Sequence, residues 1–226
     1  MPEIDQTARL IPRLVTIAVL AAAYMALTVA LELGWVNGLD HNVLQLMSTN
    51  WHEQLHPLFQ GIALLGGIEL TAILMIGLAG FLARRKPRGD AWVFVAFVAA
   101  VVLELLYKWN LVHPSPPAVS AHHDGPSISD IVGTSAGPHN SFPSGHMMRT
   151  VLVYGLLAFV FRRLAPWPWA RALAVPLTIV LILVVAFDRV YLNVHWESDV
   201  IGGILLGAIA LVSATVWLDR PRRVDN

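Results

Sequence analysis

The chain has 226 residues, of which 56% are hydrophobic and only 13% are charged, and its formal net charge is zero. Soluble domains carry roughly 25% charged residues, so this composition indicates a membrane protein. The balanced charge points to no particular partner, and nothing in the composition favours nucleic acid. The absence of cysteine excludes disulfides, thiolate metal sites and cysteine nucleophiles.

Long apolar segments follow one another along the chain. A helix that crosses a bilayer needs about 20 apolar residues. In the first candidate the apolar stretch runs from Leu14 to Leu33, longer than a signal-peptide core, so we expect a retained helix. The sequence therefore predicts an all-α, polytopic membrane protein, with residues 1–226 forming a single domain of six transmembrane helices. The expected spans are 12–34, 58–83, 90–111, 145–164, 171–193 and 198–218.

Basic residues are distributed unevenly over the connections. If the six helices alternate in direction, three of the 15 Lys and Arg residues fall at outer helix ends, namely Lys108, Arg149 and Arg189. The others fall on the opposite side, and because basic loops stay in the cytoplasm we expect both termini to be cytoplasmic. A cation that is retained against this bias usually has a function. The twelve on the expected cytoplasmic side are Arg9, Arg13, Arg84, Arg85, Lys86, Arg88, Arg162, Arg163, Arg171, Arg220, Arg222 and Arg223.

Two outer connections have features of their own. Residues 112–144 form a long outer loop rich in Pro, Ser, Gly and His, and a loop of this length is usually functional or mobile. Residues 37–57 and the position after them carry apolar side chains at a helical spacing, namely Leu44, Leu46, Met47, Trp51, Leu55 and Leu58. This spacing predicts a short amphipathic helix that lies at the outer membrane interface.

The run Phe142-Pro143-Ser144-Gly145-His146 stands where the long loop enters the fourth span. Pro and Ser favour a helix start, and Gly lets another group approach the backbone closely. A helix start presents unpaired N–H groups and a positive dipole end, which together bind anions. The pattern therefore indicates a phosphate site with His146 beside it, although an ordinary capped helix has the same signature.

Arg189, His195 and Asp199 span the end of the fifth apolar segment and the start of the sixth. His195 and Asp199 are four residues apart, so on a helix they would share a face, and the carboxylate could fix the tautomer of the imidazole. The other ring nitrogen would then be available as a nucleophile. A structural His–Asp pair at a helix start is the alternative interpretation.

Lys108 closes the third span and is followed by His113-Pro114-Ser115-Pro116. Glu104 lies one turn before Lys108, so a lysine that extends to the interface and pairs with this glutamate is an equally simple interpretation.

Together these residues resemble the type-2 phosphatidic acid phosphatase family of integral membrane lipid phosphatases. The family pattern is Lys, six residues, Arg-Pro; then Pro-Ser-Gly-His; then Ser-Arg, five residues, His, three residues, Asp. The second motif is intact here at residues 143–146, and the order and spacing of the third are kept from Arg189 to Asp199. Two positions depart from the pattern: Ser115 replaces the arginine of the first motif, and Asp188 replaces the serine of the third.

The resemblance implies a mechanism without metal or cofactor, and the distribution of basic residues puts the three motifs on the extracytoplasmic face. His195 attacks phosphorus to form a phosphohistidine, Asp199 orients His195, and His146 protonates the leaving alkoxide and then activates water. Phosphate binding falls to Lys108, Ser144, Gly145 and Arg189, with His113 as a candidate substitute for the missing arginine. The implied partners are a lipid phosphate and the bilayer, with no nucleic acid and no protein partner indicated. Phosphatidic acid, phosphatidylglycerol phosphate and polyprenyl pyrophosphate all fit as substrates.

Three alternatives remain open from the sequence. A phosphotransferase would use the same first step, with a second alcohol in place of water. A purely structural or binding protein, including a catalytically inactive phosphatase relative, would catalyse no reaction. Residues 52–56 also read His-Glu-Gln-Leu-His, which matches the zinc-protease pattern if both histidines share one helix face with Glu53 as the base.

Overall fold

The computed structural model describes residues 2–85, 88–117 and 140–220. Over these residues the chain is helical, apart from short turns and one isolated bridge between Pro114 and Asn140. The long helices are α1 (Pro2–Glu32), α4 (Ile68–Arg84), α5 (Val93–Asn110), α7 (Gly145–Leu164), α8 (Pro168–Tyr191) and α9 (Glu197–Leu218). The shorter elements are α2 (Asn37–Thr49) and α3 (His56–Gly66), with 3-10 turns η1 (Glu53–Leu55) and η2 (Arg88–Trp92).

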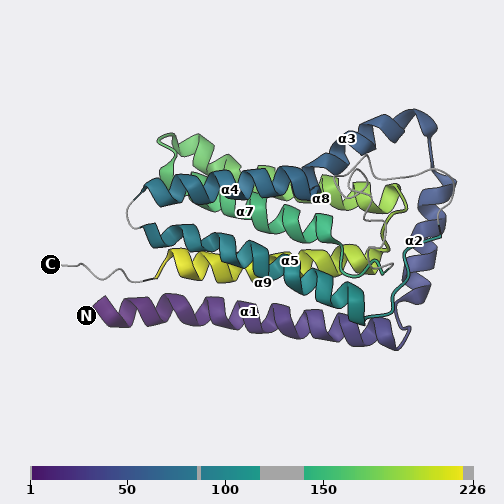
Figure 1. Cartoon of the computed structure of the whole chain (residues 1–226), viewed down its shortest axis with the longest axis horizontal. Helices are drawn as coiled ribbons and strands as arrows, with labels where there is room; N and C mark the ends of the chain where they lie inside the picture. The colour runs from purple at the N-terminus through teal and green to yellow at the C-terminus, as the bar shows by residue number, and fades with distance from the viewer. Residues whose placement is uncertain (1, 86–87, 118–139, 221–226) are drawn as a thin grey trace.

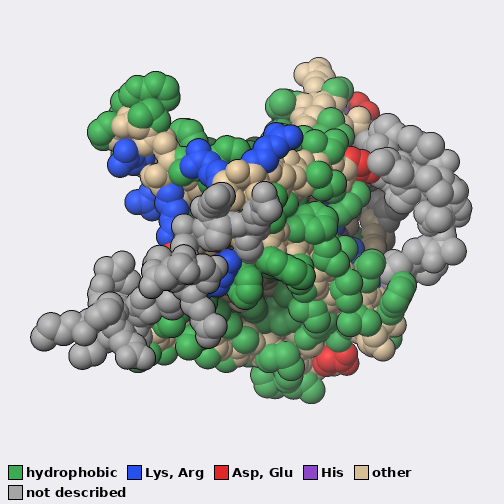
Figure 2. All heavy atoms as spheres, turned by 60° about the vertical axis from the view of Figure 1, so that its left-hand side comes forward, with side chains coloured by type: hydrophobic (Ala, Val, Ile, Leu, Met, Phe, Trp, Pro, Cys, Tyr) green, Lys and Arg blue, Asp and Glu red, His purple; other side chains and the backbone are tan. Residues whose placement is uncertain are grey.

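The long helices lie side by side and alternate in direction along the bundle (Figure 1). Helix α2 runs across one end of this bundle, whereas α1 begins and α9 ends at the opposite end. The helix expected within residues 37–57 is therefore present as α2, and it lies transverse to the others. Lys and Arg side chains gather at the end away from α2 (Figure 2), where α4 and α7 finish with Arg84, Arg162 and Arg163.

Five segments of the described chain are long and apolar enough to cross a membrane: Leu10–Glu32, Glu53–Arg84, Asp90–Asn110, Pro168–Tyr191 and Glu197–Leu218. Most of their surface is uncovered by protein, and large apolar side chains such as Ile73 and Leu177 are more than 60% exposed. So much exposed apolar surface fits contact with lipid rather than water. The protein is thus a multi-pass membrane protein, and these segments match five of the six expected spans.

The sixth expected span, 145–164, is helix α7, which has a different character. It carries His146 and Arg149 near its start and basic residues in its last turn, which lowers its mean hydropathy. Most of its residues are buried, and it packs against α9, α8, α4, α3 and α5. Surrounding helices shield α7 from lipid, so its sequence tolerates polar side chains that an outer helix would not.

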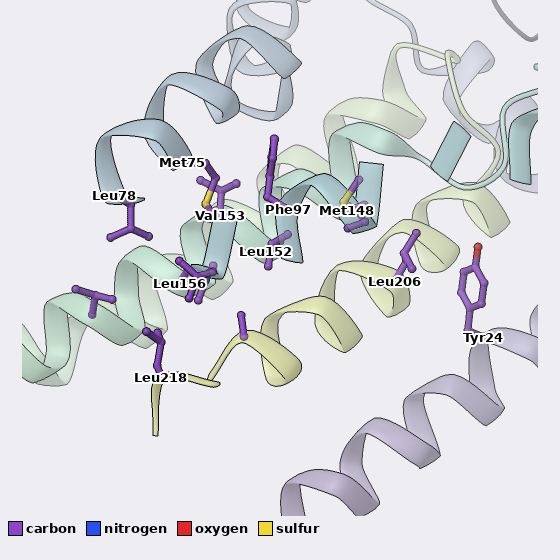
Figure 3. Packing of buried hydrophobic residues seen from close by; sticks show 14 of the residues in the cluster. Tyr24, Met75, Leu78, Phe97, Met148, Leu152, Val153, Leu156, Leu206 and Leu218 are labelled. Carbon is purple, nitrogen blue, oxygen red and sulfur yellow. The ribbon is translucent and has the colours of Figure 1, made fainter. Parts of the chain in front are cut away.

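Small residues allow α7 and α9 to pack closely. A Cβ atom on Gly203 would lie 2.4 Å from the carbonyl oxygen of Ser144 and 2.8 Å from the Cβ of Met147. Gly207, one turn later, meets the backbone of Met148 in the same way. This Gly-x-x-x-Gly pair is the pattern that lets two membrane helices approach at backbone distance. Met148 and Leu152 of α7 and Leu206 of α9 belong to the main hydrophobic core (Figure 3).

The expected span 58–83 is two helices rather than one. Helix α3 ends at Gly66, and Gly67 adopts an extended conformation with ψ 150° before α4 begins. A break of this kind leaves carbonyl groups without helical partners. Two side chains of α7 satisfy them: the hydroxyl of Tyr154 donates to Leu65 O at 2.9 Å, and Nε of Arg149 donates to Gly66 O at 3.2 Å. The break thus brings α3 against the start of α7.

Candidate active site

Three segments that are distant in sequence meet at the end of the bundle that α2 crosses (Figure 1). Lys108 lies in the last turn of α5, Ser144 is the N-cap of α7, and Arg189 lies in the last turn of α8. The start of α7 is joined directly to α9, because the backbone N–H of Ser144 donates to the carbonyl oxygen of Asp199 at 3.0 Å. The structure therefore brings all three motifs to one site.

Asp199 is the carboxylate on which several of these groups converge. It is fully buried, and its Oδ2 lies 3.4 Å from Nδ1 of His195. Its Oδ1 lies 3.3 Å from Nε2 of His113, so two imidazoles share one carboxylate. This arrangement directs Nδ1 of His195 inward and leaves Nε2 as the ring nitrogen that can react.

The contact between His195 and Asp199 does not arise as the spacing suggested. The sequence predicted that both residues share a helix face, but α9 begins at Glu197, after His195. Asp199 instead lies at the third helical position and reaches back across the helix start. Its carboxylate also accepts the backbone N–H of Trp196 at 2.9 Å, which is half of a capping box. The same carboxylate therefore caps the helix and holds the histidine.

A buried glutamate links Lys108 to the start of α7. Glu104 accepts from Nζ of Lys108 at 2.9 Å and from the guanidinium of Arg149 at 3.0 Å. Gly145 packs directly on this carboxylate, since a Cβ there would lie 2.0 Å from Glu104 Oε1. The expected pairing of Lys108 with Glu104 is thus present, but as part of a three-residue cluster that includes Arg149, which sequence reasoning did not place in the site.

The first turn of α7 presents the groups expected of an anion site. The hydroxyl of Ser144 is buried and has no hydrogen-bond partner among the described residues. His146, the second residue of the helix, is half-buried. The side chains that act on it electrostatically include Arg189, Lys108 and His195, which places it within the same cluster of charges.

Asp188, one of the two departures from the family pattern, forms an ion pair with Arg189. Both side chains are fully buried. Oδ2 of Asp188 accepts from Nε of Arg189 at 2.8 Å and from a terminal nitrogen of the same guanidinium at 2.5 Å. The carboxylate therefore fixes the orientation of Arg189 and offsets its positive charge.

Asn140 fixes the segment that carries His113. Its amide donates to Lys108 O at 2.8 Å, and its Oδ1 accepts the backbone N–H of His113 at 3.0 Å. Ser141 N then donates to His113 O at 2.9 Å. Asn140 was not predicted, and no sequence signal marks it, because its role depends on contacts with residues about thirty positions earlier.

Ser115, the other departure, is exposed and lines a cavity of about 200 Å³ between this segment and α2. Asn37, His41 and Trp196 line the same cavity, and the indole N–H of Trp196 donates to Pro114 O at 2.8 Å. His113 also borders this space. The position of the expected arginine thus faces open space rather than packed protein.

Helix α2 contributes a buried residue that sequence reasoning missed. Asp40 is 2% exposed, and its carboxylate accepts from the backbone N–H of Ser198 at 3.0 Å and from the Ser198 hydroxyl at 2.7 Å. A carboxylate at a helix start satisfies free N–H groups and complements the dipole. Asp40 therefore anchors α2 to the turn of α9 that contains Asp199.

Two sequence features lie outside this site. Most of the long loop, with His122, His123 and His139, falls outside the described residues. The His52–His56 pattern is described, and the helical geometry that it requires is not present: His52 is extended, residues 53–55 form η1, and α3 begins only at His56. The metalloprotease interpretation is therefore wrong in its structural premise.

Comparison with known proteins gives a family and several relatives. A model of the PAP2 superfamily matches residues 89–223, more than half of the chain. "Putative undecaprenyl-diphosphatase YbjG" of Escherichia coli (strain K12) is 32% identical over 66% of this chain and 65% of its own length. "Decaprenylphosphoryl-5-phosphoribose phosphatase" of Mycobacterium tuberculosis (strain ATCC 25618 / H37Rv) is 31% identical over 60% of this chain and 65% of its own length. The chain thus spans just under two thirds of the length of these two relatives.

Longer matches come from Bacillus subtilis. "Phosphatidylglycerophosphatase B" of strain 168 is 25% identical over 82% of this chain and 86% of its own length. The crystal structure of a transmembrane PAP2 type phosphatidylglycerolphosphate phosphatase superposes with a TM-score of 0.78, covering 92% of this chain and 98% of the other at 22% identity. The structural likeness concerns the fold, and it covers nearly the whole chain.

Proposed function

The chain belongs to the PAP2 superfamily, and we propose that it is an integral membrane phosphatase that hydrolyses the phosphate ester or pyrophosphate of a lipid. The observation that supports this most directly is the joint position of His195 and Asp199 beside the start of α7. Undecaprenyl-diphosphatase and phosphatidylglycerophosphatase are the activities named for the relatives, and both act on lipids with a terminal phosphate.

In the first proposed step, Nε2 of His195 attacks phosphorus and the bond to the leaving oxygen breaks. Asp199 holds Nδ1 of the same ring and stabilises the positive charge that develops on it. His146 donates a proton to the departing oxygen, so the lipid leaves as an alcohol from an ester and as a lipid monophosphate from a pyrophosphate. The product of this step is a phosphohistidine on the enzyme.

The second step returns the enzyme to its starting state. His146, now neutral, takes a proton from water while the water oxygen attacks phosphorus, and the bond to His195 breaks. Lys108, Arg189, the Ser144 hydroxyl and the Gly145 N–H hold the phosphoryl oxygens through both steps. Such fixed donors stabilise the charge that develops in the transition state. His113, at the Asp199 carboxylate, would add positive charge when it is protonated.

The proposed placement in the membrane follows from the charges. We infer that α7 also crosses the bilayer, giving six spans in one domain, and that α2 lies at the interface. The Arg-rich end of the bundle faces the cytoplasm with both termini, so the site faces the extracytoplasmic side. Because the chain has no cysteine, single cysteines at Val112 and Arg85 can be compared in intact cells with an impermeant thiol reagent. We expect labelling at residue 112 and none at residue 85; the reverse pattern would invert the topology.

The activity itself is tested by turnover. Purified protein in detergent should release inorganic phosphate from a panel containing phosphatidic acid, phosphatidylglycerol phosphate and polyprenyl mono- and diphosphates. The control is His195→Ala, which should release none. Phosphate appearing on an added lipid alcohol rather than in solution would identify a phosphotransferase, and no turnover with any lipid phosphate would contradict the proposed function.

A further inference from the structure

The fixed charges of the site balance one another. Over the described residues, the cations of the site are Lys108, Arg149 and Arg189, and the carboxylates beside them are Glu104, Asp188 and Asp199; a further carboxylate, Asp40, lines the cavity beside Ser115. Each cation contacts a carboxylate: Lys108 and Arg149 contact Glu104, and Arg189 contacts Asp188. Asp199 is faced by two histidines. The histidines apart, the six side chains of the site sum to zero, so a bound phosphate receives positive charge only from groups that are already partly neutralised and from a histidine, such as His146, that holds a proton.

Asp188 has the greatest effect on this balance. Its contact with Arg189 involves two nitrogens of the guanidinium, and neither side chain is exposed to water. Because water does not screen a buried pair, the carboxylate offsets the positive charge of Arg189 more strongly than a surface partner would. Nothing in the proposed mechanism uses Asp188, although it lies beside one of the phosphate-binding residues.

We propose that Asp188, together with the uncharged Ser115, makes this site selective for a lipid phosphomonoester over a lipid pyrophosphate. This inference rests on the proposed phosphatase function and specifies its substrate class. A phosphomonoester carries between about one and a half and two negative charges near neutral pH. A pyrophosphate ester adds a second ionised phosphate, which a site with so little net positive charge stabilises poorly. The tail of the lipid plays no part in this discrimination.

The cavity beside Ser115 allows the proposal to be tested by adding a positive charge as well as by removing a negative one. The cavity of about 200 Å³ at this position gives room for a longer side chain. An arginine introduced there would add one positive charge next to His113, in a cavity that Asp40 also lines, without displacing a core residue. Asp188→Asn removes one negative charge and keeps an oxygen that can accept from Arg189. The two variants change the charge of the site in the same direction by different means.

The experiment compares farnesyl monophosphate with farnesyl diphosphate, which share one tail. For wild type, D188N and S115R, the ratio of kcat/KM for diphosphate to that for monophosphate is measured from phosphate release. We expect each variant to raise this ratio by about tenfold to a hundredfold, the range for one charge-assisted hydrogen bond. Charge-matched controls are Glu32→Gln, on an exposed residue at the end of α1, and Val112→Arg, three residues before Ser115; neither should change the ratio.

A binding measurement separates charge preference from leaving-group chemistry. Farnesyl phosphonate should inhibit wild type more strongly than the methylene-bridged farnesyl diphosphonate does. In D188N and S115R the inhibition constants of the two compounds should lie closer together. If wild type prefers the diphosphonate, or if neither variant shifts the ratio, the inference is wrong even though the enzyme is a phosphatase. If wild type hydrolyses neither lipid, the proposed function fails instead, and direct titration of both phosphonates still decides the charge preference. D188N can lose stability because the buried Arg189 no longer faces a carboxylate, whereas S115R changes only an exposed residue.

Discussion

The backbone N–H of Ser144 donates a hydrogen bond of 3.0 Å to the backbone carbonyl oxygen of Asp199. This contact fixes the first turn of α7, which carries the proposed phosphate-binding groups, relative to the carboxylate that holds His195. Because both partners are main-chain atoms, the distance between the two functional segments depends on how closely α7 and α9 pack rather than on a side-chain contact.

Gly203 lies at the closest point of this packing, so Gly203→Ala should disturb the site. The added Cβ would fall 2.4 Å from Ser144 O, and the two helices would have to separate. Overpacking of this kind costs about 1–3 kcal/mol, and we expect a lower Tm together with a large loss of kcat. Gly77→Ala is the matched control, because a Cβ on Gly77 would meet no atom within 4 Å and alanine is favoured in a helix. Equal effects of the two changes would contradict this view of the interface.

We expect Asp40, which takes no part in the proposed mechanism, to support turnover through its contact with the start of α9. Removing its carboxylate in Asp40→Ala leaves the Ser198 N–H and hydroxyl without their acceptor, which costs about 1–2 kcal/mol for a lost helix cap. Because α9 carries Asp199 at its start, we expect kcat to fall about tenfold while KM changes little. Asp40→Asn should restore part of the activity, since its amide oxygen can accept the same N–H. Asn42→Ala, on an exposed position of α2, is the control and should behave as wild type.

Activity should survive chelation, because Lys108 and Arg189 supply the positive charge in the proposed mechanism. Phosphate release measured before and after treatment with EDTA is expected to be the same. His52→Ala should also leave activity near normal, since His52 contacts Asn50 O and Tyr191 rather than the site. Loss of activity on chelation, with rescue by zinc, would show that the cationic side chains are not sufficient.

The sequence was most informative about features that depend on residues close to one another in the chain. Apolar length predicted the positions of the helices, and the Pro-Ser-Gly-His run predicted where α7 begins, because helix starts have residue preferences of their own. The spacing of His195 and Asp199 predicted their contact but not its geometry, since the helix starts two residues later than a shared face requires.

What the sequence did not reveal depends on contacts between distant residues. The break at Gly67 is stable because Tyr154 and Arg149, far along the chain, take up the carbonyl groups that it leaves. Asp40 acts on Ser198, 158 residues later. The rule that charged residues in membrane helices have partners applies to Glu104 and Arg149, but only the fold shows that they are partners of each other.

The most direct test of the account is the covalent intermediate on His195. Wild-type protein is mixed with a lipid phosphate that carries labelled phosphorus, quenched within one turnover, and assayed for an acid-labile, base-stable phosphoenzyme. We predict that wild type and His146→Ala both form the phosphoenzyme, the latter more slowly because proton transfer contributes about 10²–10⁴-fold. His195→Ala should form none. A phosphoenzyme that persists in His195→Ala and disappears in His146→Ala would reverse the two roles, and its absence from wild type would contradict covalent catalysis by histidine.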